Sequence, residues 1–302
     1  MIKRGKMETK MQKLVVKNTK DFSIKQILDC GQIFRYYLLT DKLAVVISSE
    51  KLAVVKENVN NVEIFAKDIK YFEQYFDLQT DYNKIKKELS KDKFLKPCCE
   101  SCYGIRILKQ DFFEMLISFM ISANNNISRI KKSVNLLSKK FGKQYKIELP
   151  NFIDCETDLF VCKNGEVAYY SFPTLEELKN ASVQDFIDVG LGYRAEQMYE
   201  TVHKLTQSDI ENFKKKSNKE KYRWLLSLKG VGEKVANCIM LFSESDTTSF
   251  PVDTWINKVY NDITKTNTQN RKEIECELKS RYKNLSGYAQ QYFFYYYRNF
   301  KK

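Results

Sequence analysis

The sequence contains a single histidine, His203, among its 302 residues. Any site that needs two histidines is therefore excluded, including the zinc sites built from paired imidazoles. His203 lies in MYETVHKLTQ, a stretch with helical character, where we interpret it as a surface or packing residue. The chemistry of this protein must therefore be sought among other side chains.

Long apolar runs are also absent. No stretch approaches the roughly 20 apolar residues that a membrane-spanning helix needs. The first segment, MIKRGKMETKMQK, has no apolar core of the length found in signal peptides. We therefore expect no membrane partner.

Metal-binding cysteine patterns are incomplete. Of eight cysteines, only Cys98, Cys99 and Cys102 cluster, in PCCESC, and no matching second pair follows. Zinc and iron–sulfur sites need such a pair or a fixed spacing of four cysteines. We predict free thiols, no metal and no cofactor, and the reduced cysteines without an export signal indicate the cell interior.

Positive charge is plentiful. Lys and Arg number 51 against 38 Asp and Glu, so the net charge is +13. An excess of this size favours polyanionic partners, above all nucleic acid.

The chain divides into a β-rich beginning and a helical remainder. Residues 12–70 hold short runs rich in Val, Ile and Tyr between polar turns, which predict an antiparallel sheet. From about residue 70 apolar residues recur at spacings of three and four, which predicts helices up to an aromatic-rich last helix, YAQQYFFYYYRNF. Residues 143–173, with two prolines and mixed polarity, are expected to form a long loop or insertion. No Gly/Ser-rich linker separates the parts, so we predict one α+β body.

A glycine-rich turn stands between two predicted helices in LKGVGEKVANC, residues 228–238. Gly230 and Gly232, on either side of Val231, allow positive φ angles and close approach of another backbone. The N–H groups of such a turn and of the following helix can bind a DNA phosphate. An ordinary corner between two helices explains the same residues equally well.

Lys234 follows this turn in the first turn of the next predicted helix. The helix dipole disfavours a cation there, and partial burial would lower the pKa of the lysine further. A lowered pKa leaves more of the neutral amine, which is the nucleophilic form, near neutral pH. Cys238 lies four residues further and shares the helix face. A solvated lysine and a core cysteine remain the alternatives.

Asp253 lies nineteen residues after the lysine, in FPVDTWINKVY. It can cap the next helix, and it can also hold the amine and stabilise positive charge that develops on a sugar. The two roles are compatible.

The order of these motifs resembles the helix-hairpin-helix DNA glycosylase superfamily, and in particular its 8-oxoguanine DNA glycosylase/AP lyase branch. The resemblance runs over nearly the whole chain and is carried by LKGVGEKVANC with PVD and by CGQIFR, GIRILKQD, ISANNNISRI, SFPTLEEL, GLGYRAE and GYAQQYFF. It implies a β-rich N-terminal domain packed on a larger helical domain. We expect a basic tail over 1–11, the β-rich domain over 12–107 and the helical domain over 108–302.

The resemblance also assigns the chemistry. Lys234 matches the amine that attacks C1′ of the sugar and releases the damaged base, and Asp253 matches the assisting carboxylate. The resulting Schiff base allows β-elimination, which nicks the strand. Gly230, Val231 and Gly232 match the hairpin that binds phosphate.

Base recognition is implied for four further residues. Cys238 and Phe294 match the pair that sandwiches the everted base, and flipping is required because the reaction cannot occur inside the stack. Gln290 matches the residue that reads the Watson–Crick edge. Gly31 matches the residue whose carbonyl accepts the N7–H that distinguishes the lesion from guanine.

The opposite strand is expected to meet Asn124, Arg129, Tyr193 and Arg194, which match the residues that fill the gap and contact the estranged cytosine. Trp255 departs from the pattern, because family members often carry a histidine there. The 143–173 segment is longer and more polar than the resemblance implies, and the family suggests no role for it. The PCCESC cluster does not match the four-cysteine iron–sulfur loop of related glycosylases, so we expect no iron–sulfur cluster.

Taken together, these features predict a bifunctional glycosylase/AP lyase that excises 8-oxoguanine from duplex DNA as a monomer. The alternatives are a glycosylase of the same fold for another damaged or mispaired base, a non-catalytic DNA-binding helical protein, and an interaction scaffold that uses the aromatic last helix. We expect the protein in the cytoplasm, with the nucleoid, of a prokaryotic cell or in the nucleus of a eukaryotic cell.

Overall fold

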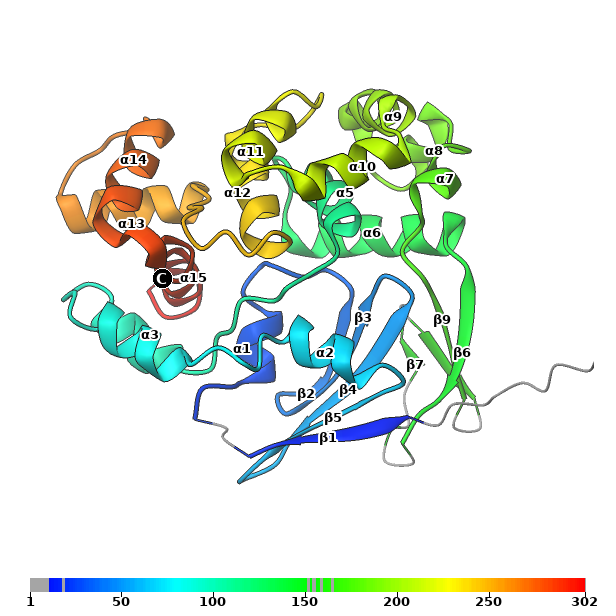
Figure 1. Ribbon diagram of the computed structural model, residues 1–302, viewed down its shortest axis with the longest axis horizontal. Coiled ribbons are helices and arrows are strands. Elements are labelled where there is room, and N and C mark those ends of the chain that lie inside the picture. Colours follow the sequence, from blue (N-terminus) through cyan, green and yellow to red (C-terminus); the bar gives the residue numbers. More distant parts are fainter. Residues whose placement is uncertain are drawn as a thin grey trace, which may run out of the picture.

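The computed structural model describes residues 11–17, 20–150, 153, 156–157, 160–163 and 166–301. The expected basic tail lies outside these residues except for Met11. Within them, an antiparallel sheet begins the chain and helices form most of the rest (Figure 1). The predicted α+β class is confirmed.

The first sheet has the strand order β1-β5-β4-β3-β2. Its strands are β1 (Gln12–Val16), β2 (Tyr36–Thr40), β3 (Leu43–Ser48), β4 (Lys51–Glu57) and β5 (Val62–Ala66). The central strands are apolar on both faces because both faces are covered. Ala44 and Val46 pack into a core cluster with α1 (Ile24–Leu28) and α2 (Ile69–Tyr75), whereas Val45 and Ile47 pack into a second cluster on the other face.

The prediction of a loop over residues 143–173 is wrong. This segment forms a second antiparallel sheet of order β6-β9-β8-β7, with β6 (Gln144–Glu148), β7 (Glu156–Thr157), β8 (Phe160–Lys163) and β9 (Glu166–Tyr170). Its buried Ile147, Val167 and Tyr169 join the cluster on the outer face of β3 and β4. Pro150 and Pro173 lie outside the strands, so they bound the strands and do not interrupt them.

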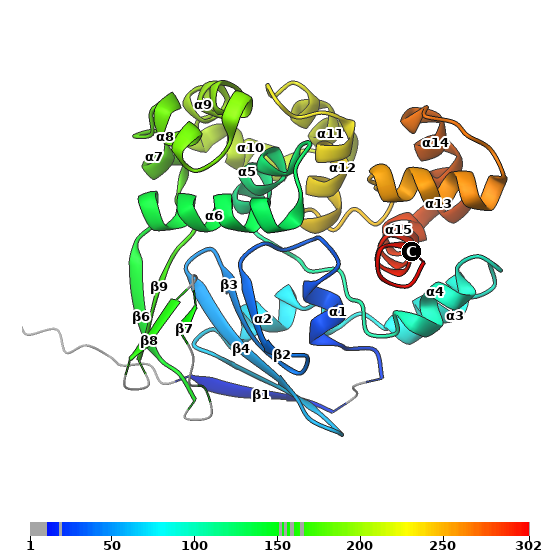
Figure 2. The ribbon, with the colours of Figure 1, turned by 180° about the vertical axis from the view of Figure 1, so that it is seen from behind.

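The helical part is built around α5 (Phe112–Ser122), whose 11 residues are all buried. A mostly apolar helix that is buried on every face belongs in the centre of a core. Its neighbours α6 (Ile127–Phe141) and α12 (Glu233–Phe242) pack on it (Figures 1 and 2). The other helices are α3 (Tyr82–Leu89), α4 (Lys96–Ser101), α7 (Leu175–Leu178), α8 (Val183–Asp188), α9 (Ala195–Lys204), α10 (Gln207–Lys215), α11 (Asn218–Leu226), α13 (Thr254–Thr264), α14 (Arg271–Tyr282) and α15 (Ser286–Asn299), with 3-10 turns η1 (Gly192–Arg194) and η2 (Lys283–Leu285).

Helix α15, near the C-terminal end of the described chain, meets the turn that follows α1. This helix packs against α13 and α4, and one buried cluster joins its aromatic residues to Cys30 at the end of α1 (Figures 1 and 2). Residues from near position 30 and near position 290 therefore share one wall. None of the described helices is long and apolar enough to cross a membrane.

The predicted domain boundary at 107/108 lies in the extended stretch that leads from α4 into α5. The second sheet follows this boundary in the chain, yet it packs on the first sheet. The domain limits remain a prediction.

Candidate active site

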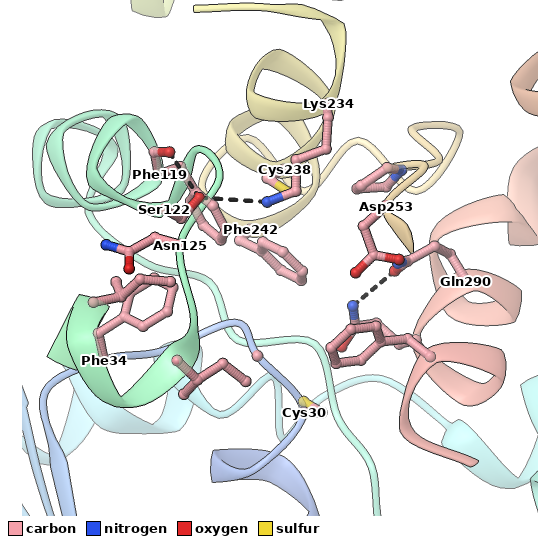
Figure 3. Close-up of a pocket in the computed structure, with 16 residues that line it drawn as sticks. Cys30, Phe34, Phe119, Ser122, Asn125, Lys234, Cys238, Phe242, Asp253 and Gln290 are labelled. Carbon is pink, nitrogen blue, oxygen red and sulfur yellow. Dashed lines mark hydrogen bonds between the residues drawn. The ribbon is translucent and has the colours of Figure 1, made fainter. Parts of the chain in front are cut away.

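A pocket opens between α5, α12, α15 and the turn after α1 (Figure 3). The structure brings together here six residues that the sequence analysis assigned to catalysis and base binding, and these are Gly31, Lys234, Cys238, Asp253, Gln290 and Phe294. They come from positions more than 250 residues apart, so only the fold places them around one cavity.

The glycine turn before α12 differs in one respect from the prediction. Gly230 has a φ of +84°, as predicted. Gly232 has a φ of −97° and a ψ of 179°, which is extended backbone that any residue can adopt, and it forms the N-cap of α12. A Cβ atom at Gly232 would meet nothing within 4 Å, so the chain leaves open space in front of the helix N-terminus. Val231, between them, is buried.

Lys234 lies in the first turn of α12 and is half-buried. Its Nζ lies 3.4 Å from Ser122 Oγ and 5.3 Å from the centroid of the Phe119 ring. The amine thus lies at the C-terminal end of α5, inside the pocket, with no carboxylate in hydrogen-bond contact within the described chain (Figure 3). Such an amine is free to approach an electrophile that enters the cavity.

Asp253 occupies the opposite side of the pocket from Ser122 (Figure 3). Its Oδ1 accepts a hydrogen bond of 2.9 Å from Ile256 N, so the predicted N-cap of α13 is confirmed. Burial raises the pKa of this carboxyl, and the backbone hydrogen bond and the charge of Lys234 oppose that rise. The carboxylate therefore carries a desolvation cost that a positive charge in the pocket would offset.

Gly31 and Phe294 form one wall. Gly31 has a φ of +75°, and a Cβ atom there would lie 3.0 Å from Phe294 Cε1. A glycine is therefore required both by the backbone conformation and by the contact. The Arg298 guanidinium lies 5.3 Å from the centroid of the Phe294 ring and 2.8 Å from Asp29 Oδ1, so a cation–π contact links this ring to an ion pair.

Cys238 lines the pocket from α12, one turn beyond Lys234. Burial raises the pKa of its thiol to about 11, against the opposing effect of the Lys234 charge. A neutral, polarisable thiol is suited to contact with the face of a flat ring and is not a nucleophile near neutral pH.

Gln290 and its neighbour Gln291 both line the pocket from α15 and are buried. Gln291 Nε2 donates a hydrogen bond of 2.7 Å to Gln290 Oε1 (Figure 3). The sequence analysis assigned no role to Gln291. The repeated glutamine in YAQQYFF was the signal available.

Three of the four residues predicted to meet the opposite strand gather in one place. Asn124, with a φ of +47°, donates from Nδ2 to Tyr193 Oη over 3.3 Å, and the Arg194 guanidinium lies 4.9 Å from the centroid of the Tyr193 ring. Tyr193 is 67% exposed, so its ring projects outward while its hydroxyl is held. Arg129 is exposed on the first turn of α6 and no hydrogen bond joins it to the other three in the described chain.

The pocket also contains residues that the sequence analysis did not assign, among them Phe34, Phe119, Ser122, Asn125 and Ile127. Ser122, the hydrogen-bond partner of the Lys234 amine, is the last residue of α5, and Ala123 separates it from the asparagine run. A serine in such a helix reads as a core or terminal residue, so its contact with Lys234 needed the tertiary structure.

Cys98, Cys99 and Cys102 are buried against α15 as free thiols. Burial raises the pKa of all three thiols, to about 12 for Cys98 and about 11 for Cys99. In the part of the chain that the structure describes, no three His, Cys, Asp or Glu side chains converge as metal ligands. Trp255 is half-buried beside Asp253, with the Lys258 ammonium 4.7 Å from its ring centroid, so a cation–π pair occupies the position of the expected histidine.

Two family models match consecutive parts of the chain. Residues 14–116 match the N-terminal domain of 8-oxoguanine DNA glycosylase, and residues 117–284 match the HhH-GPD superfamily of base excision DNA repair proteins.

The sequence is also similar to N-glycosylase/DNA lyases from other organisms. A probable N-glycosylase/DNA lyase of Methanothermobacter thermautotrophicus is 30% identical over 74% of this chain and 72% of its own length. The N-glycosylase/DNA lyase of Saccharomyces cerevisiae is 36% identical over 52% of this chain, and the match spans only 41% of the yeast protein. Among solved structures, the Clostridium acetobutylicum 8-oxoguanine glycosylase/lyase, in complex with double-stranded DNA containing cytosine opposite 8-oxoG, is 36% identical, with a TM-score of 0.85 over 98% of this chain and 100% of that one.

Proposed function

Because this chain belongs to the 8-oxoguanine DNA glycosylase family within the HhH-GPD superfamily of base excision repair proteins, we propose that it excises 8-oxoguanine from duplex DNA and then nicks the strand. The observation that carries the proposal is the single pocket in which the Lys234 amine and the Asp253 carboxylate lie with Gly31, Cys238, Gln290 and Phe294. A relative of the same fold binds DNA containing this lesion, which supports the choice of substrate.

Lys234 is the proposed nucleophile. Its nitrogen forms a bond to C1′ of the everted nucleotide, and the bond from C1′ to the base nitrogen breaks, so that the base leaves with the bonding electrons and takes up a proton. Asp253 lies where it can stabilise the positive charge that develops on the sugar. Opening of the sugar ring then gives an iminium between Lys234 and C1′.

The iminium explains why an amine is needed. Loss of a proton from C2′ places electrons next to the iminium, and the C3′–O bond breaks with departure of the 3′ phosphate. Water as nucleophile would leave no iminium to accept these electrons. A glycosylase without the lyase step would therefore have no use for Lys234.

The pocket residues have matching roles in base binding. Cys238 and Phe294 offer the two faces between which a flat base fits, Gln290 offers its amide to the Watson–Crick edge, and the Gly31 backbone can approach the imidazole edge without a side chain in the way. At the rim, Asn124, Tyr193, Arg194 and Arg129 are proposed to contact the opposite strand. The turn of Gly230, Val231 and Gly232 is proposed to bind a phosphate at the open N-terminus of α12.

Borohydride trapping tests this function. Borohydride reduces the iminium to a stable amine, so the protein should become linked to a duplex that carries 8-oxoguanine opposite cytosine. Lys234→Gln should abolish the linkage and nicking while duplex affinity stays within about threefold, because one amine is a small part of the interface. Lys214→Gln, which removes the same charge from the exposed end of α10, should trap normally.

The same experiment separates the alternatives. Trapping with another damaged or mispaired base in place of 8-oxoguanine would indicate a different glycosylase. Normal binding with no adduct on any substrate, unchanged by Lys234→Gln, would indicate a non-catalytic DNA-binding protein. We further propose that the protein acts as a monomer and works where the DNA is, with the nucleoid of a prokaryotic cell or in a eukaryotic nucleus.

A further inference from the structure

Gln291 presents an unusual buried acceptor beside the base-binding pocket. The side chain is 2% exposed, it lines the cavity, and its Oε1 has no hydrogen-bond partner among the described residues. A buried carbonyl oxygen without a donor is unfavourable, and such groups are rare in folded proteins. The residue that carries it lines the pocket that the base must enter.

The hydrogen bond between the two glutamines limits what Gln290 can offer. A glutamine amide has two lone pairs on Oε1 and two donors on Nε2. Because Gln291 Nε2 donates to Gln290 Oε1 over 2.7 Å, one lone pair of Gln290 is already used. Gln290 therefore retains one acceptor position and its Nε2 donors.

A guanine-type base presents three groups along its Watson–Crick edge. These are O6, which accepts, and N1–H and the 2-amino group, which donate. The remaining groups of Gln290 can satisfy two neighbouring positions, O6 and N1–H. The 2-amino group then needs an acceptor of its own, and the unpaired Oε1 of Gln291 is an acceptor on the same wall.

We propose that Gln291 is a specificity-determining residue whose Oε1 accepts a hydrogen bond from the 2-amino group of the everted base, while its Nε2 orients the Gln290 amide. The two adjacent glutamines thus read the whole edge together. This inference rests on the proposed function, since it assumes that an oxidised guanine enters this pocket. It predicts a preference for purines with a 2-amino group.

The test compares 8-oxoguanine with 8-oxohypoxanthine, which lacks only the 2-amino group, each opposite cytosine. Single-turnover base release by the wild type should favour 8-oxoguanine. Gln291→Met keeps the size of the side chain and removes both polar atoms, and it should reduce that preference by about three- to tenfold, as expected for one lost hydrogen bond. Gln207→Met, an exposed glutamine on α10, should leave the preference unchanged.

Three results would overturn the inference. They are a wild type that does not distinguish the two bases, a Gln291→Met variant that slows both equally, and a variant that changes neither. An equal loss would mean that Gln291 acts only through the shape of the pocket. Gln291→Leu provides the same comparison should the methionine variant fold poorly, which thermal unfolding will reveal.

Failure of the proposed function gives a different result. Affinities for the two duplexes can be measured in the Lys234→Gln background, with and without Gln291→Met, and they require no chemistry. A preference in binding without trapping of the wild type would support Gln291 and contradict the lyase. Trapping without any preference would support the lyase and contradict the role of Gln291.

Discussion

Asp253 shows most clearly how one residue serves two opposed demands. Its side chain caps α13, which stabilises the helix, yet its carboxylate is buried enough for its pKa to rise. In the folded protein the charged form is therefore disfavoured relative to the unfolded chain. The cost of burying this charge is consistent with a carboxylate that acts on the sugar during the reaction and does not stabilise the fold.

The prediction at this residue concerns Asp253→Asn. The pKa of Asp253 is higher in the folded protein than in the unfolded chain, so the ionised carboxylate lowers the stability of the fold at neutral pH. This penalty disappears as the pH falls below the pKa of the unfolded chain, near 3.8. Asparagine caps helices as well as aspartate does. We expect the variant to release 8-oxoguanine at least about tenfold more slowly and to unfold at a higher temperature at pH 7, with the difference shrinking towards pH 4.

The control is Asp81→Asn at the N-cap of α3, where the aspartate is exposed. Thermal unfolding at several pH values and single-turnover kinetics provide the measurements. Equal or lower stability of Asp253→Asn at neutral pH would contradict the assignment of a burial cost.

At the scale of elements, Arg35 joins three parts of the fold. Its guanidinium donates to Ser49 O over 3.1 Å and to Tyr170 O, and it lies 3.5 Å from Glu114 Oε1 on α5. Ser49 N in turn donates to Glu114 Oε2 over 2.7 Å. Both charged side chains are almost fully buried, and burial lowers the pKa of Arg35 and raises that of Glu114. The first sheet, the second sheet and the central helix therefore meet at one ion pair, next to Phe34 of the pocket.

We expect Arg35→Met to lower the free energy of unfolding by about 3–5 kcal/mol, because it leaves the Glu114 charge buried without a partner. The double variant Arg35→Met, Glu114→Gln should lose less than Arg35→Met alone. Urea denaturation measures both. The more exposed pair of Arg281 and Asp92 supplies the comparison. Arg281→Met leaves Asp92 with its hydrogen bond from the Tyr282 hydroxyl, so it should cost at most about 1 kcal/mol. If the double variant loses as much free energy of unfolding as Arg35→Met and Glu114→Gln lose together as single variants, the proposed ion pair is contradicted.

At the scale of the whole molecule, the net charge of +13 should dominate binding to a duplex. Each phosphate contact releases counterions, so the logarithm of the binding constant should fall linearly with the logarithm of salt concentration, by about 0.9 for each contact. Lys229 is exposed beside the glycine turn, where we propose that a phosphate binds.

Lys229→Gln should therefore reduce the salt slope by about one, whereas Lys146→Gln on β6 should not change it. Fluorescence anisotropy with an undamaged duplex at several salt concentrations gives both slopes. A slope near zero for the wild type would argue against a DNA-binding role for the charge and in favour of a protein scaffold.

The local features of this protein follow from residues that are neighbours in the sequence. Period-two and period-four patterns placed the strands of the first sheet and the long helices, because these patterns follow from backbone geometry alone. The glycine turn, the capping role of Asp253 and the position of Lys234 in the first turn of α12 also depend on neighbouring residues only. The order of the motifs identified the family, which assigned residues as far apart as Gly31 and Phe294 to one site.

Other features arise only from packing between segments that are distant in the sequence. The second sheet was missed because prolines flank β7, β8 and β9, and because Ile147 of β6 and Val167 and Tyr169 of β9 become buried only against the outer face of the first sheet. The contact of Lys234 with Ser122 and the unpaired oxygen of Gln291 arise where α5, α12 and α15 converge. The burial of a side chain at such a junction depends on the side chains that the other elements place around it. The local sequence pattern of one element therefore does not reveal it.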